Sequence, residues 1–304
     1  MTNHAGPVDL VVCGTVGLDD ITTPFGAVTG VLGGSASYSA MAASYFCQPG
    51  LISIVGTDFS DDYRHHFSDH SVDLAGLAIH GQTFRWQGSY EFDLAEATTL
   101  GTQLNSLAEF KAILPLKYQK APVLLLANTD PTIQSALAEQ LPEAFTILDT
   151  MNFWITGQRF ELLKAIKLAD VLVVNDAEAR QLTDEVNLIK AAKALLAFGP
   201  EFVIIKKGEH GALLVSTDSF FATPGYPLEV VKDPTGCGDS FAGALAGYLA
   251  CQSKRDEATL RKAVVYGSAL ASFCAEDFSV NRLVGLAKSD IEERYHAFEQ
   301  FHQF

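Results

Sequence analysis

The sequence predicts an α/β protein built on a doubly wound, mostly parallel sheet flanked by helices. Two observations support this prediction: short, continuously apolar runs recur along the chain, and stretches of helical periodicity lie between them. Continuous apolar runs are typical of strands buried on both faces of a parallel sheet, and their alternation with helices indicates right-handed crossovers. The expected strands are Asp9–Gly14, Leu51–Val55, Val123–Asn128, Phe145–Asp149, Val171–Asn175 and Phe202–Lys206.

Helices are expected between these strands, where apolar residues recur at helical spacing. The last third of the chain has a different pattern, with a hairpin over residues 212–224 followed by two long helices. The expected helices are Ser35–Cys47, Phe59–Asp69, Pro131–Leu141, Gln158–Leu168, Asp176–Thr183, Leu188–Phe198, Gly238–Cys251 and Glu257–Cys274.

Two segments do not follow the alternation of strand and helix. Residues 18–32 and 78–94 are rich in turn-forming residues and alternate apolar with polar side chains, which is typical of antiparallel strands outside the main sheet. A small strand pair beside an α/β core suggests a lid over a ligand crevice. No linker, repeat or low-complexity tract divides the chain, so we expect residues 1–304 to form a single domain with this lid.

Composition narrows the functional classes. A formal net charge of −15, with no cluster of Lys and Arg, argues against nucleic-acid binding. No apolar run reaches the ~20 residues of a membrane-spanning helix, and the N-terminus has no basic region followed by an apolar stretch, so neither a membrane nor a secretory signal is expected. The five cysteines are scattered without a CxxC pair, which is typical of reduced thiols in a cytoplasmic protein.

The segment that predicts the chemistry is Asp233–Gly243, DPTGCGDSFAG. Its glycines let the backbone N–H groups of Gly236, Cys237 and Gly238 converge, and the helix that follows adds unpaired N–H groups and the positive end of its dipole. These groups form an anion site suited to a phosphate in transfer. Asp239 would repel phosphate there, but it can accept the proton of an attacking hydroxyl. The alternative is that Asp239 only caps the helix.

This run strongly resembles the C-terminal signature of the PfkB (ribokinase-like) carbohydrate kinase family, and the likeness extends from Val12 to about Phe278. The resemblance implies a ribokinase-like fold, ATP as the phosphoryl donor and Asp239 as the general base. Cys237 departs from the family, which usually has a small Ala, Ser or Gly at this place. Because cysteine is small and its backbone N–H is intact, we expect the anion site to survive; a redox role of the thiol is open.

Further matches to the family concern the substrate. Gly33 and Gly34, before an Ala-rich helix, resemble the N-terminal glycine signature, where the backbone approaches the sugar closely. Tyr38 stands where the family often has Asn, which counts against a plain ribokinase or fructokinase specificity. Asp19 matches the aspartate with which ribokinase-like enzymes bind substrate hydroxyls, and Asp20 is the alternative register.

In the expected lid, Arg85 lies next to Trp86, and this pair can hold a planar or anionic substrate group. Aromatic lid strands also pack without any ligand, so both interpretations stay open. The resemblance leaves open as well whether two copies of the chain pair through the lid.

The nucleotide side of the expected site also rests on the resemblance. Asn175 and Glu178 match an Asn-x-x-Glu motif that organises the water shell of Mg²⁺, and residues three apart at a helix start share one face. An ordinary helix N-cap is the alternative.

Lys206, Gly208 and Gly211 resemble the family's nucleotide-side loop, in which the two glycines let the backbone lie along ATP. Lys206 stands where relatives often carry Thr and is a candidate to reach a phosphate. Thr235 is assigned to the nucleotide, and Asn152 is a weaker candidate near the transferred phosphate. A monovalent cation is left open as a further cofactor.

These residues predict an ATP- and Mg²⁺-dependent kinase that phosphorylates an alcohol group of a sugar or sugar-like small molecule. The alternatives are a nucleoside kinase of the same fold and a ribokinase-like protein that senses a ligand without turnover. The presence of Asp239 counts against the second alternative. The chain contains no GxxxxGK[ST] motif, and no GxGxxG follows its first strand, so neither a P-loop nor a dinucleotide site is expected.

Overall fold

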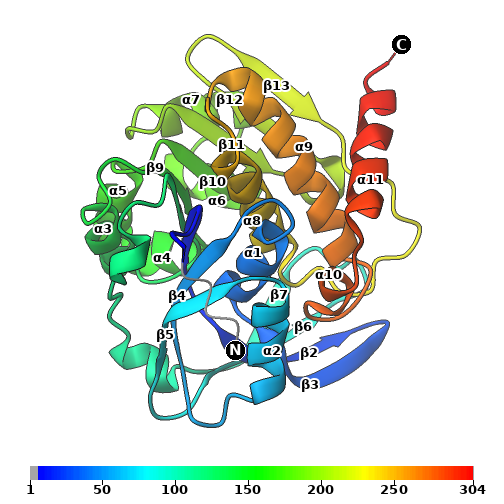
Figure 1. Ribbon diagram of the computed structural model, residues 1–304. Coiled ribbons are helices and arrows are strands. Elements are labelled where there is room, and N and C mark those ends of the chain that lie inside the picture. Colours follow the sequence, from blue (N-terminus) through cyan, green and yellow to red (C-terminus); the bar gives the residue numbers. More distant parts are fainter. Residues whose placement is uncertain (1–5, 304) are drawn as a thin grey trace.

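The computed structural model describes residues 6–303, and a nine-stranded sheet forms its centre (Figure 1). Neighbouring strands run parallel except β12 and β13, which form the expected antiparallel hairpin at one edge. In spatial order the strands are β13 (Phe220–Thr223), β12 (Ala212–Val215), β11 (Phe202–Lys206), β10 (Val171–Asn175), β9 (Phe145–Asp149), β8 (Val123–Leu126), β1 (Leu10–Cys13), β4 (Pro49–Val55) and β5 (Asp73–Ile79). The predicted doubly wound, mostly parallel sheet is thereby confirmed.

Helices cover both faces of this sheet (Figure 1). Successive strand residues point to opposite sides, so the continuously apolar strands present apolar side chains on both faces, and both must be covered. On β1, for example, Val12 belongs to the apolar core of one face and Val11 to that of the other. The first face carries α1 (Ser35–Ala43), α2 (Asp61–Asp69), α8 (Cys237–Ala250), α9 (Glu257–Cys274), α10 (Asn281–Val284) and α11 (Lys288–Phe301). The second carries α3 (Pro131–Ala138), α4 (Asn152–Gly157), α5 (Arg159–Ile166), α6 (Asp176–Thr183) and α7 (Leu188–Leu196).

A second, four-stranded sheet stands beside the first, in the order β3-β2-β6-β7. Its strands are β2 (Gly17–Thr23), β3 (Gly26–Gly33), β6 (Phe84–Tyr90) and β7 (Ala97–Gln103). The expected antiparallel pairing is found between β2 and β3, but β2 and β6 run parallel. The predicted segment 78–94 also begins too early. Ala78 and Ile79 pair with Ile54 and Val55 in the main sheet. The chain therefore enters the second sheet again, as strand β6, only after the turn at Gly81, whose φ is 64°.

Several elements have no counterpart among the expected ones, namely β5, β7, α4, α10 and α11. Strand β7 is a polar edge strand with six of its seven side chains exposed, so it lacks the apolar alternation by which a half-buried strand is found. Three short 3₁₀ helices, η1 (Asn105–Glu109), η2 (Leu116–Tyr118) and η3 (Gly208–His210), complete the connections.

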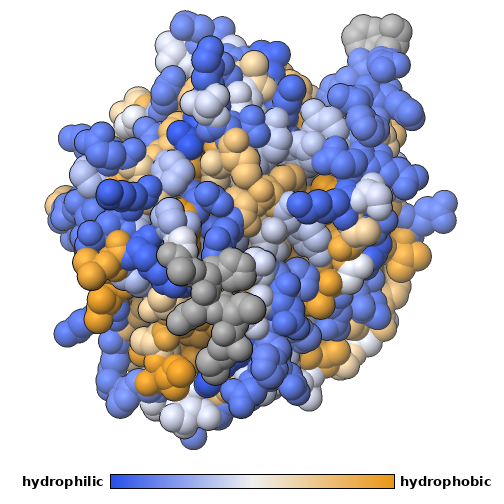
Figure 2. Space-filling view, viewed as in Figure 1, coloured by the Kyte–Doolittle hydropathy of each residue, from blue (hydrophilic) through white to orange (hydrophobic). Residues whose placement is uncertain are grey.

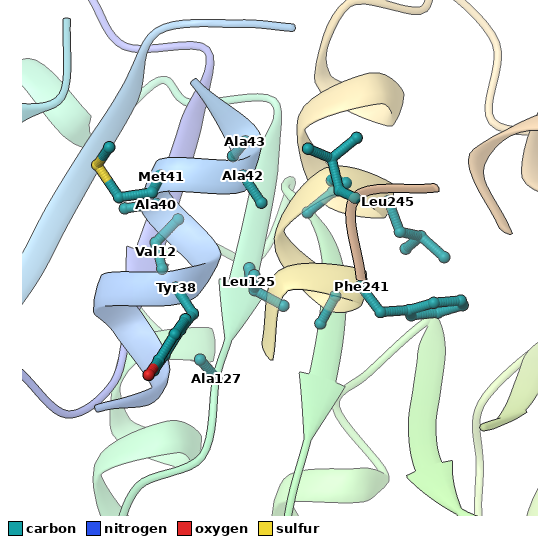
Figure 3. Packing of buried hydrophobic residues seen from close by; sticks show 14 of the residues in the cluster. Val12, Tyr38, Ala40, Met41, Ala42, Ala43, Leu125, Ala127, Phe241 and Leu245 are labelled. Carbon is teal, nitrogen blue, oxygen red and sulfur yellow. The ribbon is translucent and has the colours of Figure 1, made fainter. Parts of the chain in front are cut away.

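Close packing of α1 against α8 brings the two glycine-rich motifs together (Figure 3). A Cβ at Gly243 would lie 2.1 Å from the backbone oxygen of Ser39, and one at Gly247 would lie 2.8 Å from the Cα of Ala43. The Ser39 hydroxyl donates to the backbone oxygen of Asp239 at 2.9 Å. The small residues of both helices therefore allow a backbone approach that holds the N-terminus of α8 over that of α1.

On the face shown in Figure 2, hydrophilic residues predominate and hydrophobic ones gather in small groups, in keeping with the high net charge. Within residues 6–303, no helix has both the length and the apolar character needed to cross a bilayer.

Candidate active site

Three polar residues end three adjacent parallel strands. Asp149 closes β9, Asn175 closes β10 and Lys206 closes β11, and the strand register places Asn175 beside Lys206. Ligands of doubly wound sheets bind outside the carboxyl ends of the strands. The sheet therefore gathers these side chains at the edge where a site is expected.

The turn before α8 has the conformation that the glycine-rich motif predicts. Gly236 is the N-cap of α8 with a φ of 77°, and a Cβ there would lie 2.4 Å from the ring of Tyr38. The N–H of Ser240 donates to the backbone oxygen of Gly236, and the N–H of Cys237 donates to that of Pro234. Gly238, in the first turn of α8, lies next to the ammonium of Lys206, which ends β11, so the positive end of the helix dipole lies near the carboxyl ends of the strands.

Asp239 lies in this first turn and is partly buried. Burial and the nearby Asp149 carboxylate raise the pKa of Asp239 to about 7, although the Lys206 ammonium opposes this rise. A carboxylate with such a pKa can both accept and release a proton near neutral pH, which a general base requires.

Lys206 is the cation of this cluster. Its Nζ lies 2.9 Å and 3.1 Å from the two carboxylate oxygens of Asp149, and 3.1 Å from the position of a Cβ built on Gly238. Burial disfavours the ammonium, but the carboxylates of Asp149 and Glu178 outweigh it and raise the pKa of Lys206. The structure thus brings Lys206, Glu178, Gly238 and Asp239 together around Asp149. Asp149 opens the strand-end segment 149–152, in which the resemblance implies a polar group near the transferred phosphate, but Asn152 and not Asp149 is the candidate predicted from the sequence.

Asn175 and Glu178 form a complete capping box at the start of α6. The Asn175 side chain accepts from the N–H of Glu178 at 2.8 Å, and Oε2 of Glu178 accepts from the N–H of Asn175 at 2.7 Å. The ordinary N-cap therefore exists, and it does not use Oε1 of Glu178. Burial, with a contribution from Asp149 that Lys206 opposes, raises the pKa of Glu178 to about 7.

Asp19, on β2, is 3% exposed, and its Oδ1 has no hydrogen-bond partner within the described chain. Burial and the carboxylate of Asp233 raise the pKa of Asp19 to about 8. A Cβ on Gly33 would lie 1.9 Å from Oδ2 of Asp19, so only glycine fits there. Asp20, the alternative register, instead accepts from the N–H of Gly30 at 2.7 Å across the β2–β3 hairpin.

Tyr38 lies beneath Gly236 rather than at an open surface. It is 1% exposed, and its hydroxyl is buried without a hydrogen-bond partner in residues 6–303. Burial and then Asp19 raise the pKa of Tyr38 well above its ordinary value. Gly34 has a φ of 89°, and a Cβ on it would lie 2.5 Å from the backbone oxygen of Thr15.

Thr235 connects the glycine-rich turn to the second sheet. Its N–H donates to Oδ1 of Asp233 at 2.9 Å, and its hydroxyl donates to the hydroxyl of Tyr90, on β6, at 3.1 Å. Asp233 is fully buried, and its Oδ2 has no partner among the described residues. Asp233 begins the glycine-rich motif, but the sequence predicts no role for it, and Tyr90 is not singled out because nothing in its local pattern distinguishes it from a packing residue.

The remaining candidates lie around this cluster. Gly208 and Gly211 have φ values of 54° and 83° in the loop after Lys206. Arg85 lies 3.5 Å from Asp58, whose other oxygen accepts from Thr83, and the pair is well exposed. Arg85 thus belongs to a neighbouring polar group, separate from the buried acids.

Asn152, the weaker candidate near the transferred phosphate, begins α4 and is exposed.

Two thiols lie near the glycine-rich turn. The thiol of Cys274 donates to the backbone oxygen of Thr235 at 3.5 Å. Hydrogen bonding to this same Cys274 thiol, together with burial, raises the pKa of Cys237 well above its ordinary value. A protonated thiol is a poor nucleophile, which argues against a redox role of Cys237.

The arrangement is one that can transfer a phosphoryl group. It combines a helix N-terminus and an ammonium for an anion, a carboxylate able to accept a proton beside them, and a separate buried carboxylate for hydroxyl groups.

Comparison with known proteins agrees with this class of site. A model of the pfkB family carbohydrate kinases matches residues 16–284. The cytidine kinase of Thermococcus kodakarensis is 30% identical over 250 residues, which cover 79% of this chain and 88% of that protein. The nucleoside kinase of Methanocaldococcus jannaschii has the same fold, with a TM-score of 0.76 at 18% identity over 96% of this chain and all of that one.

An E. coli protein described as ribokinase II, in complex with ATP and Mg²⁺, gives a TM-score of 0.76 at 19% identity over 96% of this chain and 99% of that one. The chain belongs to the pfkB family of carbohydrate kinases and has the ribokinase-like fold. It is a phosphotransferase that acts on a hydroxyl group, and the predicted family, fold and enzyme class are confirmed.

Proposed function

We propose that this kinase transfers the terminal phosphoryl group of ATP to an alcohol of a sugar or nucleoside, with Asp239 as the general base. The observation that supports this most directly is the position of Asp239 in the first turn of α8, with a pKa of about 7, beside the buried ammonium of Lys206. The base accepts the hydroxyl proton while the first-turn amide of Gly238 and the positive end of the α8 dipole stabilise the transferred group; the N–H of Cys237 is already bonded to Pro234.

The residues around Lys206 also fit Mg²⁺. Asp149, Glu178 and Asp239 lie near a single ammonium, and burial, with a further contribution from Asp149, raises the pKa of Glu178 and of Asp239, so a divalent cation there would favour their ionised forms. Among residues 6–303, no three acidic, His or Cys side chains are gathered closely enough to hold a metal by themselves. Asn175 and Glu178 would therefore hold Mg²⁺ through its water shell, where it neutralises phosphate charge.

On the substrate side, we assign Asp19 to bind substrate hydroxyls, with Gly33 and Gly34 allowing a close approach and Tyr38 beneath them. The unpartnered Oδ1 of buried Asp19 supports this role, because an unpaired buried oxygen costs roughly 1–3 kcal/mol that a substrate hydroxyl can recover. Arg85 stays a proposed substrate residue at the outer edge of the site, on β6 next to the strand of Asp19, where it is paired with Asp58.

On the nucleotide side, Gly208, Gly211 and Thr235 are assigned to ATP, with Lys206 at its phosphates. Buried Oδ2 of Asp233, which lacks a partner in residues 6–303, supports a monovalent cation beside the anion site. The second sheet would act as the lid, held shut by the bond between Tyr90 and Thr235. Its exposed edge strand β7 supports pairing of two copies through this lid.

A nucleoside acceptor is the favoured substrate within this class. The likeness to a cytidine kinase extends over 79% of this chain, whereas the likeness to the mouse ribokinase covers 27%. A protein that senses a ligand without turnover is disfavoured because Asp239 would have no function in it. The five free thiols support a reducing, cytoplasmic location.

The test is an ADP-release assay with Mg²⁺·ATP and a panel of cytidine, other nucleosides, ribose and other neutral sugars. Acceptor-dependent ADP release by the wild type, absent from Asp239→Asn, is the expected result. Ligand binding without any ADP release would favour the sensor instead.

A further inference from the structure

We propose that Asp149 is a positioning residue that holds the ammonium of Lys206 at the first turn of α8, where it faces Asp239 and the transferred phosphoryl group. This inference deepens the proposed kinase function and rests on it. It assigns a task to Asp149 itself, whereas Asn152 is the residue of this strand end that the sequence predicts to lie near the phosphate.

The geometry of the pair supports this task. Lys206 and Asp149 end strands β11 and β9, and the ammonium contacts both oxygens of the Asp149 carboxylate. The lysine side chain is 15% exposed and the aspartate side chain 3%, so solvent hardly screens the pair. Nζ lies 3.1 Å from the position of a Cβ on Gly238, which places it over the first turn of α8.

Asp149 is a rigid anchor. Its carboxylate oxygen Oδ1 accepts from the N–H of Thr150 at 3.0 Å, and its backbone oxygen accepts from the buried amide of Gln134 at 3.0 Å. Lysine, in contrast, carries its charge on a flexible four-carbon stem. Without the two contacts to Asp149, the ammonium of Lys206 is free to leave the first turn of α8 for Glu178.

The two residues of the pair also have opposite effects on the pKa of the base, Asp239. The Asp149 carboxylate raises the pKa of Asp239, and the Lys206 ammonium lowers it. The further titratable groups near Asp239 are Cys237 on its own helix α8 and, on other elements, Glu178 on α6, Asp19 on β2 and Tyr38 on α1. The substitutions below leave these groups unchanged.

The test compares Asp149→Asn with Lys206→Met in the full chain, measuring kcat/KM against pH with Mg²⁺·ATP and cytidine or ribose. The base must be ionised, so activity falls as the pH drops through the pKa of Asp239. Loss of the ammonium in Lys206→Met moves this acid limb to higher pH. Asp149→Asn removes a carboxylate, which alone moves the limb to lower pH, but it also releases the ammonium, which moves the limb back up. The downward shift on Asp149→Asn should therefore be smaller when Lys206 is present than in the double variant compared with Lys206→Met. On the high-pH plateau we expect Lys206→Met to lose at least ~10²-fold in kcat and Asp149→Asn up to ~10²-fold, because its ammonium is misplaced.

Asp73→Asn is the matched control. Asp73 forms another buried ion pair, with Lys117, at the start of β5 and away from the site. This variant loses stability without moving the acid limb. An effect of Asp149→Asn on the limb and on kcat that is equal with and without Lys206 overturns the proposal, because Asp149 would then not act through the ammonium.

A carboxyl carbon NMR titration of Asp239 in the free protein measures the same shifts without turnover. A wild type that releases no ADP with any acceptor therefore contradicts the proposed kinase reaction, whereas this titration still decides the role of the pair. A downward shift of the Asp239 pKa on Asp149→Asn that is smaller with Lys206 present than in the Lys206→Met background supports the inference, and equal shifts refute it.

Discussion

The hydroxyl of Tyr90 lies 3.1 Å from that of Thr235, and this bond joins the second sheet to the glycine-rich turn before α8. The two residues are 145 positions apart in the sequence. Burial raises the pKa of Tyr90 above its ordinary range, so the phenol stays neutral and keeps its hydrogen-bonding role at any physiological pH. Strand β6 of the second sheet thus ends at the turn that carries the proposed anion site.

Tyr90→Phe removes this bond and keeps the ring. If the second sheet excludes water as a lid, acceptor-independent ATP hydrolysis should rise relative to phosphoryl transfer, and the KM of the acceptor should rise about 2- to 10-fold, as expected for the loss of one hydrogen bond. Paired assays of ADP and of phosphorylated acceptor measure this ratio.

The control is Tyr63→Phe, which removes a hydrogen bond of 2.9 Å from the Tyr63 hydroxyl on α2 to the backbone oxygen of Gly30 on β3. This bond also joins a helix to the second sheet but does not involve Thr235. It should lower the melting temperature slightly and leave the ratio of hydrolysis to transfer unchanged. Equal ratios in the two variants would contradict a specific role of Tyr90.

Asp239→Asn distinguishes a general base from a residue that only caps the helix. Asparagine has the shape of aspartate but cannot accept the hydroxyl proton, and loss of a general base typically costs ~10²–10⁴-fold in rate. Because the raised pKa of about 7 makes the ionised carboxyl unfavourable in the folded state, stability at pH 7.5 should not fall. Turnover, ATP affinity and melting temperature decide; near-normal turnover would contradict the mechanism.

Glu178→Gln tests the proposed role of Glu178 in holding Mg²⁺ through its water shell. Glutamine keeps an oxygen to accept from the N–H of Asn175, so the capping box and the fold should persist, but the charge offered to the water shell of Mg²⁺ is lost. We expect half-maximal activity to require more Mg²⁺, together with a lower kcat. Asp176→Asn, which alters an exposed neighbour paired with Arg180, is the control and should leave the Mg²⁺ titration unchanged.

Asp19→Asn tests both binding and pH dependence. The carboxyl has a folded-state pKa of about 8, raised from 3.8, so the folded protein binds this proton more tightly than the unfolded chain does. Its contribution to stability is therefore present at acidic pH and is lost as the pH rises toward about 8. Urea unfolding between pH 5 and 8.5 should show a shallower decline for Asp19→Asn than for the wild type.

The same variant should bind the acceptor more weakly, because asparagine replaces one of the two carboxyl oxygens with an NH₂ group, and the lost hydrogen bond contributes roughly 0.5–1.5 kcal/mol. Asp20→Asn loses only the hairpin bond to Gly30 and should bind the acceptor normally. The reverse result would assign the substrate to Asp20.

Local chemistry alone determined much of this protein. The continuously apolar strands, the helices between them and the hairpin of β12 and β13 follow from patterns read within a few residues. The left-handed turn at Gly236, which demands glycine, and the start of α8 are equally local. These patterns were sufficient to predict the fold and the position of Asp239.

Only the tertiary structure decided which side chains meet. Lys206 reaches Asp149 across 57 positions, Tyr90 reaches Thr235 across 145, and the register of β4 with β5 moves Ala78 and Ile79 into the main sheet. No periodicity records such pairings, since each is set by the order of strands and the depth of burial. The same burial raises the pKa values of Asp19 and Asp239, because it removes the water that would stabilise their charges.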